Sequence, residues 1–325
     1  MTGLFWSAVS IGSRMLVAFG LFFLLSKSVS VEVFGKVTFF YAGAFILGLV
    51  VDYGYGLKLI KDLHESHGCF KNVISKAVTI KVINSTLLLA LVFLIPYESQ
   101  QDLVTFFLLI LGQVFNQIGS TAFPILRYYG EFKTETKYVI LNNIVTFLIF
   151  IVLIDSDMPE LYILPISVLI GKLVLFLAYV KNYGFSLDIT NTFKLDYRNS
   201  FSYFLHSFAG FAYMNLDTIL LKVHVGYYEI AQYQAGLKVL AAAIIFSDVL
   251  VNYFYPYIIK NGYDSEGVPK PKTHFKIKTL FYIAGALSAI LFFVICNSYL
   301  DLLFTARYSL PLLTISLLSL VVFLR

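Results

Sequence analysis

The sequence predicts an all-α polytopic membrane protein with two pseudo-repeated helical lobes. About ten apolar stretches, each near the roughly 20 residues that a helix needs to cross a bilayer, follow one another along the chain. At least five of these stretches carry a charged residue well inside the apolar span. Hydrophobic residues make up 59% of the chain, charged residues make up 13%, and the mean hydropathy is +0.81. Because a soluble domain does not need so apolar a composition, we expect a membrane protein with a polar interior path.

The apolar runs and the loops between them define the predicted spans in order. They lie near 4–25, 37–60, 77–96, 103–126, 138–154, 161–180, 200–221, 230–259, 279–296 and 309–325. The first is a permanent helix rather than a signal peptide, since no basic segment precedes it and Arg14 lies in the middle of its apolar run.

Basic residues are distributed unequally between the two sides of the membrane. Loops after even-numbered spans hold 14 of them, and loops after odd-numbered spans hold only 4, together with a cluster of acidic residues at 155–160. The positive-inside rule therefore places the N-terminus and the loops 61–76, 127–137, 181–199 and 260–278 in the cytoplasm. The net charge of +5 is explained by this orientation, and we expect no nucleic acid as a partner.

The long polar loop 181–199 divides the sequence into an N-terminal lobe of six spans, 1–180, and a C-terminal lobe of about four, 200–325. A shift of about 197 residues lays Glu32 on Glu229, so that in each half an acidic residue opens the second span. This placement fits the parallel repeats of transporters, whose substrate site lies between the halves.

The two cysteines are expected on opposite sides of the membrane. Cys69 falls in a predicted cytoplasmic loop and Cys296 at the far end of a predicted span, without a histidine cluster near either one. A disulfide and a metal site are therefore not expected, and the sequence indicates no cofactor.

Three basic residues lie deep in predicted spans: Arg14, Lys172 and Lys238. Arg14 is roughly 15 Å deep and shares a helix face with Ser7 and Ser10. Its guanidinium either faces a cavity, where it could bind a phosphate through two hydrogen bonds, or bonds to carbonyls of a neighbouring helix. Lys172 and Lys238 either line that cavity or extend to the interface. For Lys58 and Lys81, near cytoplasmic span ends, extension to lipid headgroups is the better interpretation.

The candidates for coupling transport to an ion are Asp52, Asp217, Asp248 and His206. Asp52 is deep enough in its span to be protonated or paired with Arg14 or another base. His206 and Asp217 are predicted to share one face of a continuous helix, as a proton relay or, alternatively, as a helix–helix contact.

A polar stripe runs along the fourth predicted span, through Gln113, Asn116, Gln117, Ser120 and Thr121. Its spacing places all five residues on one helix face. The stripe is either a cavity wall that binds sugar hydroxyls or a set of hydrogen bonds between helices.

Three junctions between spans resemble those of Wzx-type polysaccharide flippases. They are Ser30-Val31-Glu32-Val33-Phe34-Gly35, then Asn215-Leu216-Asp217 with Gly226-Tyr227-Tyr228-Glu229-Ile230-Ala231, and Leu302-Leu303-Phe304-Thr305-Ala306-Arg307-Tyr308. Ala231 and Gln232 stand where that family has a glycine-containing pair. The family belongs to the multidrug/oligosaccharidyl-lipid/polysaccharide (MOP) superfamily, which also holds the MATE exporters.

The resemblance implies a MATE-like fold, with six spans plus at least four around a central cavity, and a C-terminally truncated sequence. It also implies a multi-pass protein of the bacterial inner membrane. Such a protein would export an undecaprenyl-pyrophosphate-linked oligosaccharide, an O-antigen or capsule repeat unit, and work beside a polysaccharide polymerase and a chain-length regulator.

Two other functions remain open from the sequence: a MATE-type cation-coupled exporter of small molecules, and a membrane-embedded polymerase or glycosyltransferase. The deep charges include three basic residues against Asp52 and Asp248, which favours an anionic headgroup over a cation. The sequence has no glycine-rich phosphate loop and no large extramembrane loop, which favours a transporter over an enzyme.

Overall fold

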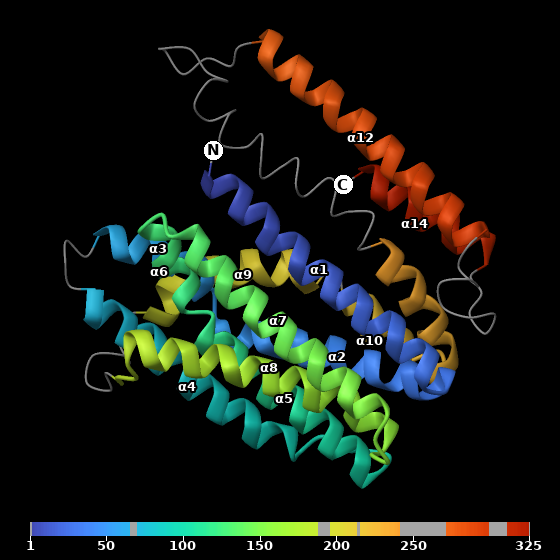
Figure 1. Ribbon diagram of the computed structural model, residues 1–325, viewed down its shortest axis with the longest axis horizontal. Coiled ribbons are helices and arrows are strands. Elements are labelled where there is room, and N and C mark those ends of the chain that lie inside the picture. The colour runs from blue at the N-terminus through green and yellow to red at the C-terminus, as the bar shows by residue number, and fades with distance from the viewer. Residues whose placement is uncertain are drawn as a thin grey trace. The chain divides into compact units, whose positions relative to one another are not determined.

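The computed structural model describes residues 2–65, 70–187, 196–212, 215–240, 271–298 and 311–324 (Figure 1). Every regular element in these ranges is a helix. This is the arrangement expected of a chain in hydrocarbon, because a helix satisfies its backbone hydrogen bonds internally. The chain forms two compact units, one of residues 32–230 and one of residues 1–31 with 231–325.

The unit of residues 32–230 holds most of the described helices. They are α2 (Val31–Asp52), α3 (Tyr55–Glu65), α4 (Phe70–Val92), α5 (Gln100–Gly119), α6 (Ala122–Tyr128), α7 (Phe132–Ile154), α8 (Glu160–Tyr183), α9 (Asp196–Ala212) and α10 (Leu216–Lys222). The other unit holds α1 (Thr2–Ser28), α12 (Pro271–Ser298) and α14 (Leu312–Leu324). A further helical stretch, 227–240, begins in the first unit and continues in the second.

Six helical stretches of the described residues are long and apolar enough to cross a membrane, and they confirm the first six predicted spans in order. They are Phe5–Ser28, Val31–Glu65, Phe70–Val92, Gln100–Tyr128, Phe132–Ile154 and Glu160–Tyr183. Of the later predicted spans, the seventh is divided into α9 and α10, and the eighth is described only as far as residue 240. The ninth lies in α12, and α14 matches most of the tenth.

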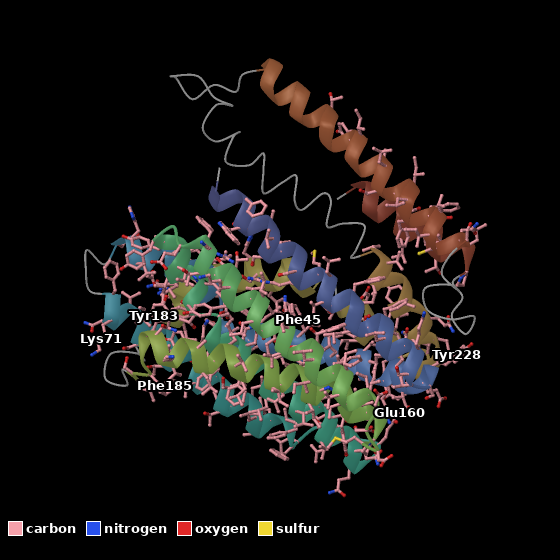
Figure 2. All side chains as sticks on the ribbon, in the orientation of Figure 1. Phe45, Lys71, Glu160, Tyr183, Phe185 and Tyr228 are labelled. Carbon is pink, nitrogen blue, oxygen red and sulfur yellow. The ribbon has the colours of Figure 1, made fainter. Side chains whose placement is uncertain are left out.

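Loops predicted on one side of the membrane gather at one end of the 32–230 unit. Figure 2 shows Lys71, Tyr183 and Phe185 at one end of its helices, whereas Glu160 and Tyr228 lie at the other. The rings of Phe70 and Tyr128, from two predicted cytoplasmic segments, are in contact at 5.9 Å. We call these two ends the inner end and the outer end, after the sides that the basic residues predict.

The second predicted span is interrupted near its inner end, between α2 and α3. Tyr53 and Gly54 both have positive φ, at 46° and 81°, so the backbone leaves the α-helical conformation there. A Cβ atom on Gly54 would lie 2.4 Å from the backbone nitrogen of Phe204 in α9, so glycine is also required for the close approach of that helix.

The fourth predicted span is interrupted in the same way, between α5 and α6. Pro124 lies in the first turn of α6 and has no N–H group to continue the hydrogen-bond ladder of α5. The N–H of Thr121 instead donates to the carbonyl of Ile118, three residues back. The carbonyl of Gln117 is therefore left without its usual backbone donor.

Small residues let the helices behind this break pack closely. A Cβ atom on Gly119 would lie 2.9 Å from the backbone nitrogen of Phe176, and one on Gly171 would meet Thr146 Oγ1 of α7. Interfaces of this type are typical of membrane helices, which gain from close van der Waals packing. α7 and α8 thus pack closely behind the break between α5 and α6.

The seventh predicted span does not have the continuous form that the sequence analysis assumed. His206 lies on α9, Asp217 lies on α10, and Asn215 is in a turn between them. The single helix face expected to carry both residues is therefore absent. The predicted acidic openings do occur, since Glu32 lies in the first turn of α2 and Glu229 in the first turn of the helical stretch 227–240.

Candidate functional site

Two polar side chains of α4 donate hydrogen bonds to backbone carbonyls that lack their helical N–H partners at the two helix breaks. The Asn84 side-chain amide donates to the carbonyl of Val50 at 3.0 Å, next to the end of α2. Lys81 Nζ donates to the carbonyl of Gln117 at 2.8 Å and to Thr121 Oγ1 at 3.1 Å. Because an unsatisfied carbonyl in hydrocarbon costs several kcal/mol, these bonds stabilise both breaks.

Lys81 also forms a buried ion pair with Asp52. Lys81 Nζ lies 2.8 Å from Asp52 Oδ1, and the lysine side chain is only 1% exposed. Asp52 Oδ2 accepts the backbone N–H of Gly56 at 2.9 Å, at the start of α3. We call Asp52, Lys81, Asn84, Gln117 and Thr121 the inner junction.

The inner junction corrects the interpretation of two lysines. Lys81 does not extend to lipid headgroups, because the break in α5 and the carboxylate of Asp52 supply it with partners inside the protein. Lys58 is buried as well and pairs with Asp62 one turn later in α3. For Asp52, the structure identifies Lys81 as the paired base.

Helix α9 packs against the inner junction. The rings of Tyr53 and Phe204 stack with their centroids 5.0 Å apart, and Tyr197 Oη donates to Asn84 Oδ1 at 2.9 Å. Burial raises the pKa of the Tyr197 phenol, as does its neighbour Tyr53, so the hydroxyl stays protonated and can donate. The first six spans and the seventh are therefore joined by specific contacts at the inner end.

A second polar cluster joins the same parts of the chain at the outer end. Lys36 Nζ of α2 lies 2.9 Å from Asp102 Oδ2 of α5 and 3.4 Å from Glu98 Oε2, in the connection between α4 and α5. Lys222, at the end of α10, lies 3.8 Å from Glu98 Oε1 and 3.9 Å from the centre of the Tyr227 ring. We call Lys36, Glu98, Asp102, Lys222 and Tyr227 the outer cluster.

Arg14 and Lys238, two of the predicted cavity residues, belong to the unit formed by residues 1–31 and 231–325. Arg14 Nη2 donates to Ser10 Oγ at 3.3 Å, which confirms that these two residues share a face of α1. Lys238 Nζ lies 4.0 Å from the centre of the Phe22 ring, a cation–π contact.

The remaining cavity candidates lie in the 32–230 unit. Lys172 is half-buried in α8. Gln113 packs against α2, because a Cβ atom on Gly48 would lie 3.0 Å from Gln113 Oε1. The carbonyl of Gln117 holds Lys81, and Asn116 is half-buried on the same helix. Part of the polar stripe thus forms contacts between helices.

The coupling candidates are not gathered at one point. Asp52 belongs to the inner junction, and His206 is exposed on α9. Asp217 Oδ1 accepts the backbone N–H of Thr218 at 2.7 Å, at the start of α10. Asp248 and Cys69 lie outside the described residues, whereas Cys296 is a free and buried cysteine of α12.

Sequence reasoning missed the partners of Lys81, the role of Asn84 and the outer cluster. Pro124 and the Tyr53-Gly54 pair were the available signals for the helix breaks, and each predicts a nearby donor for the released carbonyls. The outer cluster had a weaker signal, since all its residues lie in segments predicted on one side of the membrane. Within the described ranges, no group of His, Cys, Asp or Glu could hold a metal ion.

The comparisons with known proteins agree with this arrangement. A sequence model of the family described as polysaccharide biosynthesis protein matches residues 1–261. The fold is similar to that of a crystal structure of MATE in the bent conformation, with a TM-score of 0.52 and 14% identity, over 97% of this chain and 78% of that chain. None of the curated proteins compared with the sequence matches it.

The family match covers most of the chain, and the structural similarity establishes a MATE-like helical fold. Both agree with the junction motifs and with the six membrane-span candidates of the described residues. The chain therefore belongs to the polysaccharide biosynthesis protein family and is a multi-pass, flippase-like membrane protein of the MOP superfamily.

Proposed function

We propose that this protein moves an undecaprenyl-pyrophosphate-linked oligosaccharide, such as an O-antigen or capsule repeat unit, from the cytoplasmic to the periplasmic leaflet of a bacterial inner membrane. The observation that carries the proposal is the family match over residues 1–261 in a chain with a MATE-like fold. Polysaccharide biosynthesis requires that a lipid-linked sugar unit cross the bilayer, and a transporter fold suits that step better than an enzyme does.

The deep basic residues support an anionic headgroup as the cargo. Arg14 offers a planar set of donors that can bind a phosphate through two hydrogen bonds, whereas Lys172 and Lys238 offer point charges. Of the polar stripe, Asn116 is the first proposed contact for sugar hydroxyls, since Gln113 packs on α2; Lys81 binds only the backbone carbonyl of Gln117. Gln113 and Gln117 would line the cavity only where their side-chain amides reach it.

The contacts of the seventh span support a transport cycle of alternating access. α9 packs on the inner junction through Phe204 and Tyr197, and Lys222 at the end of α10 pairs with Glu98 in the outer cluster. A route for cargo requires these inner and outer contacts to open in turn. Asp52, Asp217, Asp248 and His206 are the proposed groups through which an ion could drive that change.

Deletion of the gene in its host tests the proposed function. We expect surface polysaccharide to be lost and the lipid-linked unit to accumulate in the cytoplasmic leaflet, with a plasmid-borne copy reversing both effects. Accumulation of unpolymerised units in the periplasmic leaflet would instead indicate a polymerase. Normal polysaccharide with increased sensitivity to toxic cations would indicate a MATE-type exporter. A polymerase or a chain-length regulator that binds the protein would be recovered by cross-linking in the same cells.

A further inference from the structure

The outer end of the 32–230 unit contains a pocket of about 430 Å³. Its walls come from α2, the connection between α4 and α5, α5 itself, α10 and Tyr227. The interior is apolar and includes Phe40, Gly43, Leu47, Phe106 and Ile219. The volume lies within the range of roughly 300–1,000 Å³ that is usual for small-ligand sites.

The polar end of the pocket carries charges of both signs. Glu98, Asp102, Lys222 and Tyr227 line it, and Lys36 pairs with both acidic residues. Partial burial of the Tyr227 phenol, together with Glu98 and Asp102, raises its pKa to about 12, so it remains a hydrogen-bond donor to Glu98. Two carboxylates and two ammonium groups thus surround the end of an apolar pocket.

In this wall of the pocket, the Asp102 carboxylate can accept more hydrogen bonds than it receives. Its side chain is 1% exposed, and Lys36 Nζ lies close to Oδ2. Apart from that ion pair, neither carboxylate oxygen accepts a hydrogen bond from the part of the chain that the structure describes. A carboxylate has about four lone-pair sites, and a buried acceptor without a donor is costly. The pocket therefore favours a ligand with N–H groups at its polar end.

The depth of the cluster indicates where such a ligand comes from. Lys36 lies in the second turn of α2, Asp102 lies in the first turn of α5, and Lys222 ends α10. In membrane-spanning helices, these ends lie near the level of lipid headgroups. A ligand at this depth can place an apolar chain in the pocket and its headgroup against the charges.

We propose that the pocket binds an aminophospholipid of the surrounding bilayer, with its primary ammonium at Asp102 and Glu98, its phosphate at Lys222, and one acyl chain against Phe106 and Ile219. A zwitterionic headgroup complements the equal numbers of acidic and basic groups. A purely anionic lipid offers Asp102 no ammonium group in addition to Lys36, and a trimethylated headgroup carries the positive charge without N–H groups. This inference goes beyond the proposed transport function, because it concerns a bound lipid rather than the cargo.

Lipid binding to the purified full-length protein tests the proposal. We would titrate it with phosphatidylethanolamine, phosphatidylcholine or phosphatidylglycerol of identical acyl chains and count bound lipids by native mass spectrometry. We expect one site that prefers phosphatidylethanolamine by about tenfold, the effect of a hydrogen bond to a charged group. Equal binding of phosphatidylethanolamine and phosphatidylcholine at every site would overturn the proposal.

Variants locate the site. We expect Asp102→Asn to remove the preference for phosphatidylethanolamine over phosphatidylcholine and Gly43→Leu, which fills the pocket, to weaken binding of both. Asp157→Asn is the matched control, because Asp157 is an exposed acidic residue of the α7–α8 connection at the same end. If Asp102→Asn does not fold, Glu98→Gln makes the same test on an exposed residue.

Photo-cross-linking separates this lipid from the cargo. A phosphatidylethanolamine with a diazirine in its acyl chain should label the pocket walls in 39–47 or 95–106. Excess polyprenyl phosphate should not compete. Competition by polyprenyl phosphate, or a preference that survives in Asp102→Asn, would contradict the assignment. Because the measurement needs no transport, its failure is distinguishable from failure of the flippase proposal.

Discussion

Lys81 is a single buried charge that stabilises two helix breaks far apart in the sequence. It binds the carboxylate of Asp52, which accepts an N–H at the start of α3, and the carbonyl of Gln117 at the break before α6. Desolvation of the pair is costly, and replacement of both partners by apolar groups can be nearly neutral. Loss of one partner leaves the other charge buried and uncompensated.

We therefore expect Lys81→Met to lower the free energy of unfolding by about 3–5 kcal/mol, with a smaller loss when Asp52→Asn is added to it. Thermal unfolding in detergent measures Lys81→Met, Asp52→Asn and the double variant. Lys71→Met is the control, since Lys71 is exposed at the start of α4. A double variant as unstable as the sum of the two single variants would show that Asp52 and Lys81 do not interact.

Arg14 belongs to the proposed cargo site. We expect Arg14→Ala to abolish export and Arg14→Lys to retain only part of it, because an ammonium keeps the charge but loses the paired donors of the guanidinium. Surface polysaccharide in a complemented deletion strain is the measurement, with membrane insertion verified by immunoblot. Export at the parental level by Arg14→Ala would remove this residue from the site.

At the residue scale, the sequence indicated which polar residues lie inside the apolar spans but not which residues they contact. The position of Asp52 in an apolar run predicted that it is paired or protonated. The partner could not be predicted, because Lys81 lies on another helix and its depth was compatible with extension to the interface. Whether Lys172 and Asn116 contact the cargo stays a prediction.

At the scale of the helices, the two helix breaks are the feature that the sequence analysis did not predict. Hydropathy predicted the first six spans, because it depends on composition over about twenty residues. A break occupies only two or three residues and leaves the average hydropathy nearly unchanged. Gly54 and Pro124 were visible in the sequence, but their effect depends on packing with Phe204 and Lys81, which hydropathy does not report.

Two glycines allow the cost of backbone strain to be measured separately from the cost of a clash with a neighbouring helix. Gly54 and Gly130 both have positive φ, at 81° and 74°, but only Gly54 has a neighbour within 4 Å of an added Cβ atom. We expect Gly130→Ala to cost about 1–2 kcal/mol, the usual cost of a left-handed non-glycine residue, and Gly54→Ala to cost more. Thermal unfolding compares them, and equal losses would mean that α9 does not press on the break.

The orientation in the membrane is a prediction at the scale of the whole molecule. Segments predicted on the same side meet at the same end of the 32–230 unit, but only the basic residues indicate which end is cytoplasmic. With Cys69 and Cys296 replaced, an impermeant thiol reagent on intact cells should label an introduced cysteine at 157 and none at 188 or 264. Labelling in the reverse pattern would invert the topology.

The fold class of the whole molecule followed from the sequence, since hydropathy and the positive-inside rule act on every span. The MATE-like arrangement came from the junction motifs and is confirmed by the structural similarity. The division into lobes at 181–199 stays a prediction. Substrate specificity could not be read in the same way, because sugar recognition uses scattered polar side chains without a fixed spacing.

Leaflet exchange in proteoliposomes tests the transport function most directly. The purified protein would be reconstituted with undecaprenyl-pyrophosphate-linked oligosaccharide that carries a fluorophore on the sugar, and a membrane-impermeant quencher would report the fraction in the outer leaflet. We predict that quenching exceeds the half expected for a static bilayer, whereas liposomes with Arg14→Ala stay near half. Quenching that remains near half with the parental protein, while the vesicles are intact, would contradict a flippase.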